Sequence, residues 1–221
     1  MSTTVRPCGD LGLLVEVHGG NGGDDRDRMD DADAVAALHA ALREQIADGR
    51  LDGVVDLVRG ARTVLVRLAP GTDVRAVTGT LAHLEPRPQD VPPEGSVVDI
   101  GVVYDGEDLD DVAAHTGLGV PEVVAAHTGQ TWTVAFAGFA PGFGYLVGED
   151  DRLVVPRRRD PRLNVPVGAV ALAAQFSGVY PRASPGGWQL IGRTGERLWD
   201  LGRTPPALLT PGTRVRFHEE G

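Results

Sequence analysis

With 221 residues, 42% of them hydrophobic, the chain is long enough to build a core as one large domain or two small ones. All 21 basic residues are arginine, and the formal net charge is -10. A chain without lysine cannot supply a Walker-type phosphate loop, a Schiff base or the base of a Ser-Ser-Lys amidase. Its acidic balance argues against nucleic acid as a partner.

The sequence carries no sign of a membrane segment, an export signal or a metal site. It has no apolar run of roughly 18 residues, and the opening MSTTVRPCGD lacks the features of a cleaved leader. The single cysteine, Cys8, cannot form an internal disulfide, and neither Cys-x-x-Cys nor His-Glu-x-x-His occurs. We therefore expect a cytoplasmic protein that does not contact membranes and has no metal site in this chain.

The first part of the chain alternates strand-like and helix-like segments. Apolar, partly β-branched runs indicate strands, Gly/Asp-rich sequence indicates a flexible loop, and apolar residues at helical spacing indicate helices. In chain order this predicts a strand, a loop, a helix, two strands and a helix at 11–17, 18–31, 30–46, 53–58, 63–68 and 74–84. The β-α-β-β-α order is typical of a small ferredoxin-like α/β layer.

A proline-rich break follows in EPRPQDVPPEG, which has four prolines in eleven residues. We place a domain boundary there, with an N-terminal domain at 1–90 and a C-terminal domain at 91–221. Beyond the break, 96–104 is a predicted strand, and VAAHTG occurs twice, each copy ending a short helix on a glycine suited to a left-handed cap. Short β-type runs at 131–137, 165–174, 188–193 and 214–217 then predict a barrel or sandwich.

The segment Gly138 to Tyr145 combines three glycines with three aromatic residues after a predicted strand. Glycine lets the backbone approach a ligand closely, and aromatic rings provide rigid apolar walls. The same composition also suits a tight structural turn, so a turn and a binding loop are both open interpretations.

Two further segments combine arginine with turn residues. Arg157, Arg158, Arg159 and Arg162 lie within six residues and could grip a carboxylate or phosphate, although a solvated surface loop is the commoner fate of such a run. The segment Ser184 to Arg193 joins a glycine turn to Trp188 and an arginine. Ser184 lacks Gly-x-Ser-x-Gly surroundings, so the sequence does not support a nucleophile elbow there.

His127 is a candidate proton-transfer group because the ordinary pKa of histidine lies near neutrality. A structural alternative is that a histidine in the last turn of a helix is favoured by the helix dipole. His115, at the equivalent place in the other VAAHTG copy, fits that alternative.

Taken in order, several segments resemble allophanate hydrolase subunit 1 proteins, of the carboxyltransferase subdomain C and D type. That family includes the small subunit of prokaryotic 5-oxoprolinase and an inhibitor of a sporulation histidine kinase. The resemblance rests on GFAPGFGYL, PRRRDPRLNVPVGAVAL, VYPRASPGGWQLIGRT and PGTRVRF, with PCGDLGLLVEV and GVVDLVRGARTVLVRL nearer the N-terminus. The chain departs from many members at Phe176, where they have an amide.

The resemblance implies an α+β fold, with the small ferredoxin-like domain followed by a cyclophilin-like β-barrel. It implies an allophanate hydrolase subunit 2-like partner, a third oxoprolinase subunit as a further partner, and ATP with Mg bound by the complex. It assigns catalysis to His127, Arg158 and Arg162. It assigns substrate or nucleotide binding to Phe139, Pro141, Gly142, Phe143, Pro185, Gly186, Gly187, Trp188 and Arg193.

Three functions follow from the resemblance. The leading one is the small subunit of an ATP-dependent amidohydrolase that opens 5-oxoproline, a small-molecule amide, to glutamate. The second is allophanate hydrolase subunit 1 in the breakdown of urea-derived amides. The third is a non-enzymatic regulator that binds a histidine kinase through its barrel.

Overall fold

We describe a computed structural model of the chain, which covers residues 2–18, 27–84 and 97–221, with the side chains of 27–31 left aside. The chain divides into two compact units, 1–93 and 94–221. Most of the predicted loop at 18–31 and the whole proline-rich break at 85–95 lie outside the described residues. The boundary between residues 90 and 91 therefore stays a prediction.

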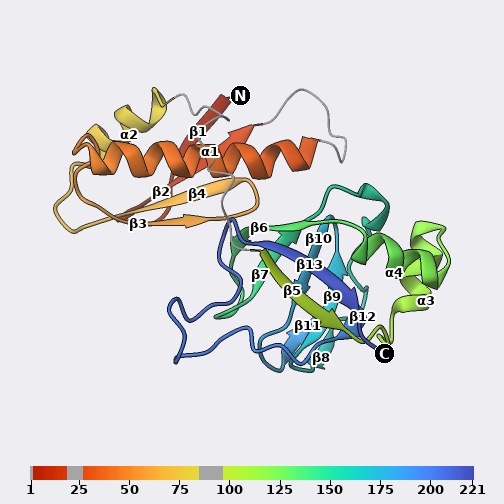
Figure 1. Ribbon diagram of the computed structural model, residues 1–221. Coiled ribbons are helices and arrows are strands. Elements are labelled where there is room, and N and C mark those ends of the chain that lie inside the picture. The colour runs from red at the N-terminus through yellow and green to blue at the C-terminus, as the bar shows by residue number, and fades with distance from the viewer. Residues whose placement is uncertain (1, 19–26, 85–96) are drawn as a thin grey trace. The chain divides into compact units, whose positions relative to one another are not determined.

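The N-terminal unit is a four-stranded antiparallel sheet with helices (Figure 1). The strands lie in the order β1-β2-β4-β3, and α1 packs against β2, β3 and β4. Alternate residues of β2, namely Leu13, Val15 and Val17, point into the core with Leu38 and Leu42 of the helix. The elements are β1 (Ser2–Pro7), β2 (Gly12–His18), α1 (Asp27–Ala47), β3 (Val54–Arg59), β4 (Thr63–Leu68) and α2 (Val74–Ala82).

The C-terminal unit contains a seven-stranded sheet in the order β12-β9-β10-β7-β6-β13-β5, with a separate β11-β8 pair. Only the β13-β5 pair is parallel. The elements are β5 (Val97–Val102), α3 (Leu109–Thr116), α4 (Val120–Thr128), β6 (Trp132–Ala137), β7 (Gly144–Val147), a 3₁₀ turn (Asp151–Leu153), β8 (Arg162–Val165), β9 (Ala169–Ala173), β10 (Phe176–Val179), β11 (Ser184–Gly186), β12 (Gln189–Arg193) and β13 (Arg214–Glu219).

The seven strands close into a barrel where the end of β5 meets β12. Val103, which directly follows β5, forms a bridge with Arg193 at the end of β12. The two residues exchange backbone hydrogen bonds, each 2.9 Å long. This seam joins the first and last strands of the sheet, and Figure 1 shows the strands curling round toward each other.

The two faces of the barrel wall belong to different apolar clusters. Val170 and Leu172 of β9 join residues from all the other barrel strands in one interior core, which α3 and α4 also enter. Ala169, Ala171 and Ala173 of the same strand join a second cluster. Because successive side chains of a strand point to opposite faces, the second cluster lies on the outside of the barrel wall.

The α+β fold class predicted from the sequence is confirmed. Three details differ. The sequence did not predict β1, β7, β8, β10 or β11, and the run expected at 165–174 holds only the last residue of β8 before β9 begins after a turn at Gly168, whose φ is 79°. Gly117 caps α3 in the left-handed conformation as predicted, but Gly129 after α4 has φ -77°, so the left-handed cap predicted there is wrong. No helix of the described part of the chain is long and apolar enough to cross a membrane.

The seam predicts a specific sensitivity at Gly192. A Cβ at this position would lie 2.5 Å from the carbonyl oxygen of Val103 and 2.9 Å from Cγ1 of Val102. We expect Gly192→Ala to lower the free energy of unfolding by about 1–3 kcal/mol, since the strands would have to separate. Gly195→Ala is the matched control, since a Cβ at that position would have nothing within 4 Å. Urea denaturation followed by tryptophan fluorescence measures both, and equal midpoints would contradict this account of the seam.

Candidate functional site

The loop between β6 and β7 is a tight turn held by its own backbone. The N–H of Phe143 donates to the carbonyl of Ala140 at 3.0 Å, and the N–H of Gly138 donates to the carbonyl of Phe143 at 3.2 Å. Phe139 has φ 65° and Gly142 has φ 84°. A phenylalanine whose backbone adopts the left-handed conformation is uncommon, and it marks a place where the surrounding structure imposes that conformation. Pro141 is exposed in this loop.

With this backbone conformation, Phe139 lies exposed at the surface, next to a group of other aromatic rings. Phe139 is 56% exposed, whereas Phe143 is 1% exposed and Trp188 4%. The ring of Phe143 lies in edge-to-face contact with those of Tyr145, Tyr180 and Trp188 at centroid distances of 5.1–5.4 Å. We call Phe139, Phe143, Tyr145, Tyr180 and Trp188 the aromatic cluster.

Glycines of strands β10 and β11 make room for this cluster. A Cβ on Gly178 of β10 would lie 2.9 Å from Cζ of Phe143 and 3.1 Å from Trp188. A Cβ on Gly186 of β11 would lie 2.4 Å from the hydroxyl oxygen of Tyr180. The glycines are therefore required by ring packing, which explains Gly186 without any contact to a ligand.

Arg157 lies directly against the aromatic cluster. Its guanidinium is 5.9 Å from the centroid of the Trp188 ring, within the range of a cation–π contact. Burial raises the pKa of Tyr180, and the charge of Arg157 opposes that rise. No carboxylate forms an ion pair with Arg157 among residues 2–18, 27–84 and 97–221. Arg157 is exposed, so a ligand can reach its N–H donors.

Arg158 and Arg162, in contrast, are both held by one buried carboxylate. Asp108 is 1% exposed and bonds Arg158 through Oδ1. Arg162 donates to Asp108 through two nitrogens at 2.8 and 2.9 Å. The backbone N–H of Leu190 donates to the same carboxylate at 2.7 Å. We call Asp108, Arg158 and Arg162 the ionic cluster.

The ionic cluster keeps Asp108 charged. Burial alone would raise the pKa of this carboxyl group, but the hydrogen bonds from Arg162 and Leu190 and the two arginine charges outweigh burial and hold the pKa below its ordinary value. Because the guanidinium groups of Arg158 and Arg162 are already bound to Asp108, these two arginines are less available to an outside anion than the sequence suggested.

Three of the segments singled out in the sequence meet at residues 184–188. The N–H of Arg158 donates to the carbonyl of Gly187 at 2.8 Å, and Arg162 of β8 pairs with Gly186 of β11. Trp188 contacts Phe143 of the loop and Arg157. Pro185, in β11, is exposed beside them. These segments are joined on the outer face of the barrel wall.

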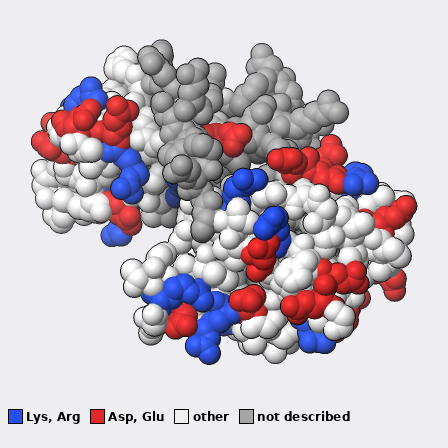
Figure 2. Space-filling model, in the orientation of Figure 1, with Lys and Arg blue, Asp and Glu red and all other residues white. Residues whose placement is uncertain are grey.

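Arg193 lies apart from that meeting point. It forms an exposed ion pair with Asp105 at 2.8 Å, and its side chain is 63% exposed. No contact between Arg193 and the aromatic cluster occurs in the described part of the chain. Its backbone instead closes the barrel seam through Val103. Figure 2 shows acidic and basic side chains interspersed over the visible face of the barrel unit, in keeping with such isolated surface pairs.

His127 lies on the opposite side of the barrel wall. Its ring is fully buried and packs against Phe217 at a centroid distance of 4.4 Å. Nδ1 is bonded to the hydroxyl of Tyr104 at 2.7 Å and Nε2 to the hydroxyl of Ser177 at 2.9 Å. Burial lowers the pKa of His127 to about 3.

This environment bears on the role expected for His127. A proton-transfer group needs a ring nitrogen within reach of the substrate, and both nitrogens of His127 are bonded to hydroxyl groups inside the core. These contacts form a structural network, and the catalytic role of His127 stays a prediction. His115, from the equivalent copy of VAAHTG, is exposed and bonds the carbonyl oxygen of Asp111 in its own helix.

Sequence reasoning missed Asp108 and Tyr180. Asp108 lies in the acidic run GEDLDD, which reads as a solvated helix start. Tyr180 follows a strand that the sequence did not predict. As for metals, no group of three or more His, Cys, Asp or Glu side chains suited to an ion occurs in the described ranges.

Comparison with known proteins gives this architecture a family. The family model of the carboxyltransferase domain, subdomain C and D, matches residues 3–209. The chain therefore belongs to that family, as the sequence resemblance indicated. A protein named as the B subunit of 5-oxoprolinase, from Escherichia coli O157:H7, is 49% identical over 128 residues, which are 57% of this chain and 59% of that protein. The match thus spans little more than half of the relative.

Solved structures support the same fold. The protein TTHA0988 is 32% identical, with a TM-score of 0.73 over 99% of this chain and 40% of that one. The urea amidolyase of K. lactis is 20% identical, with a TM-score of 0.77 over 99% of this chain and 15% of that one. At that identity, the likeness to the amidolyase concerns the fold alone.

The ionic cluster predicts a large cost for neutralising Asp108. We expect Asp108→Asn to lower the free energy of unfolding by about 3 kcal/mol, because it leaves two partly buried guanidinium groups without their carboxylate. Glu107→Gln is the control, since Glu107 also contacts Arg162 but its side chain is 78% exposed. Its loss should be under about 1 kcal/mol. Chemical denaturation of both variants measures the difference, and similar losses would show that burial of the carboxylate does not matter.

The buried state of His127 predicts a pH dependence of stability. A histidine whose pKa is about 3 in the folded chain and about 6.5 when unfolded binds its proton preferentially in the unfolded state. Its contribution to stability is therefore present above about pH 6.5 and declines as the pH falls toward 3. We expect the free energy of unfolding to fall less steeply between pH 7 and 5 in His127→Gln than in the original chain. Parallel slopes would contradict a neutral, buried imidazole.

Proposed function

We propose that this chain is a subunit of an ATP-dependent amidohydrolase of the 5-oxoprolinase type, working with a subunit 2-like partner and a third subunit. The family membership and the relatives named as B subunits of 5-oxoprolinase support this proposal. The ligand-binding face in the proposal is the outer face of the barrel that carries the aromatic cluster.

The observation that carries the site is the contrast between Arg157 and its neighbours. Arg158 and Arg162 are bound to Asp108, whereas Arg157 has its charge exposed against an aromatic face. 5-Oxoproline is a flat lactam ring bearing a carboxylate. In the proposal, Arg157 binds the carboxylate with its forked N–H donors, and the exposed ring of Phe139 contacts the lactam.

This arrangement changes the roles of the arginines expected from the sequence. Arg158 and Arg162 act as positioning residues: they hold the 157–162 segment against the barrel through Asp108 and so direct Arg157 to Trp188. His127 supports the wall from inside through Ser177 of β10, the strand whose Gly178 lies beneath the rings. None of these three residues has to touch the substrate.

ATP would make the lactam carbonyl a better electrophile by phosphorylating its oxygen. The described residues offer an exposed cation and aromatic walls, but no lysine and no group of carboxylates suited to a magnesium ion. These residues do not fit a nucleotide site within this chain, so we derive no step through ATP here. In the proposal, the assembled enzyme binds ATP with Mg.

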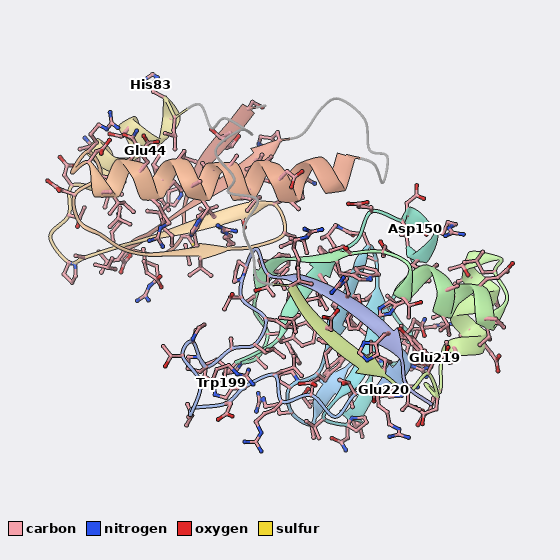
Figure 3. The ribbon with its side chains drawn as sticks, in the orientation of Figure 1. Glu44, His83, Asp150, Trp199, Glu219 and Glu220 are labelled. Atoms are coloured by element: carbon pink, nitrogen blue, oxygen red, sulfur yellow. The ribbon has the colours of Figure 1, made fainter. Side chains whose placement is uncertain are left out.

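Exposed apolar side chains on the barrel unit support a protein partner. Leu163 is 92% exposed, Val167 63% and Leu201 83%. Leu163 and Val167 lie on or next to β8, the strand that pairs with β11. Trp199, whose Cβ would lie 3.1 Å from a Cβ added at Gly142, is 39% exposed on the loop after β12 (Figure 3). A large partner seated there would cover these side chains and close off the ligand face.

The same exposed side chains would also suit the regulator hypothesis, in which the barrel docks on a histidine kinase. That function needs no exposed cation against an aromatic face, so Arg157 favours the enzyme subunit.

A kinetic experiment tests the proposed function. In the reconstituted complex, we expect Arg157→Ala to raise the KM for 5-oxoproline about tenfold to a hundredfold, because a charge-assisted hydrogen bond contributes about 1.5–3 kcal/mol. Arg216→Ala is the control, since Arg216 forms an exposed pair with Asp99 away from the aromatic cluster. Substrate-dependent ATP hydrolysis is the measurement. An unchanged KM in Arg157→Ala would remove the site assignment, and no hydrolysis by any complex would remove the function.

A further inference from the structure

A second group of basic side chains lies in the N-terminal unit, at the edge of its sheet. His39 and Arg43 are four residues apart on α1, so they lie on the same side of the helix one turn apart. Arg59 is the last residue of β3, the edge strand that packs beside this helix. Its Nη2 donates a hydrogen bond of 2.8 Å to Nδ1 of His39.

Arg59 points toward the helix side of the sheet. It pairs in register with Val64 of β4, which is fully buried in the core beneath α1. Cross-strand partners share a face, so the stem of Arg59 enters the half-buried edge of this core. Its guanidinium reaches His39 there, while Arg43 is exposed.

A groove of about 360 Å³ opens beside His39 and Arg43, whereas Arg59 does not line it and lies next to it through its hydrogen bond to His39. His39 and Arg43 line one side of it, and Ile46, Val54 and Leu57 supply an apolar surface. The only acidic residue that lines it among the described residues is Asp56, which is paired with Arg67 at 3.5 Å. The groove therefore combines a basic side with an apolar one.

The basic groups oppose one another in this structure. Burial first, and then the charges of Arg59 and Arg43, lower the pKa of His39 to about 4. Burial and the charge of Arg43 also lower the pKa of Arg59. No carboxylate forms an ion pair with Arg43 or Arg59 in the part of the chain described here. A half-buried guanidinium next to a second one is costly unless an anion compensates both.

We propose that a small oxyanion, the carboxylate or phosphate of a compact metabolite, binds at the basic side of this groove, where Arg43 lines it and Arg59 lies next to it through His39. The oxygens accept hydrogen bonds from the two guanidinium groups, and the rest of the ligand lies against Ile46, Val54 and Leu57. Guanidinium forks match the geometry of carboxylate and phosphate oxygens. The proposal concerns the N-terminal unit only and does not depend on the function proposed for the barrel.

The test is a titration of the full chain, followed by the NMR signals of the His39 ring. Inorganic phosphate and acetate are the probes, and sodium chloride at matched ionic strength is the control for screening. We expect a saturable shift with at least one probe, whereas chloride gives none. Saturation by phosphate alone identifies a phosphate site, and saturation by acetate alone identifies a carboxylate site. Non-saturating shifts that match chloride for both probes would overturn the proposal.

Variants separate the site from general charge. Arg43→Gln changes an exposed helix residue and should keep the fold, yet weaken binding about tenfold, as expected for loss of one charged contact. Arg59→Lys keeps the charge but loses the fork, and should also bind more weakly. Arg6→Gln, which removes an arginine of β1 at the opposite edge of the sheet, should bind as the original chain does. Equal affinity in Arg43→Gln, Arg59→Lys and Arg6→Gln would contradict the assignment, and none of these readouts involves ATP hydrolysis.

Discussion

The buried carboxylate of Asp108 determines how the outer face of the barrel is organised. Asp108 occupies the N-cap position of α3, where an aspartate usually accepts a hydrogen bond from its own helix, yet its side chain makes no such bond. The carboxylate turns instead to Arg158, Arg162 and the N–H of Leu190. The carboxylate therefore connects the start of α3 to the 157–162 segment and to strand β12, and α3 has no side-chain cap.

The contacts of Asp108 also determine the position of Arg157, the residue before Arg158. With Arg158 and Arg162 drawn to Asp108, the chain at 157–158 is fixed against Gly187, and Arg157 lies against Trp188. The rings can gather there because β9 presents only alanines outward, at 169, 171 and 173, and β10 presents Gly178. The small residues on the outer face of these strands therefore leave space for the rings.

These relations explain which features the sequence could predict. The helices and most strands were predicted because apolar periodicity is a local property, as in α1 and β4. The strand β11 is only three residues long and carries a proline and a glycine, so local pattern cannot distinguish it from a turn. The aromatic loop and the arginine segment were found by composition, but composition could not show which arginine is neutralised, because the partner Asp108 is 50 residues from Arg158.

The two VAAHTG copies show the same limit most directly. Identical hexapeptides place His115 on an exposed helix face and His127 in the core, since α4 but not α3 turns that residue toward Phe217 and Ser177. No local rule separates the two histidines; only the packing of α4 on β13 does.

Some arginines of this chain form ion pairs with carboxylates, and others do not. The chain has 31 acidic residues for 21 arginines, so carboxylates are not scarce. Surface arginines such as Arg193 and Arg216 have acidic partners close by. An arginine that forms no ion pair lacks favourable Coulomb energy that an anion from outside can supply. Arg157 against an aromatic face and Arg43 with Arg59 beside an apolar groove share this property, and in both places a ligand can contact a cation and an apolar surface at once.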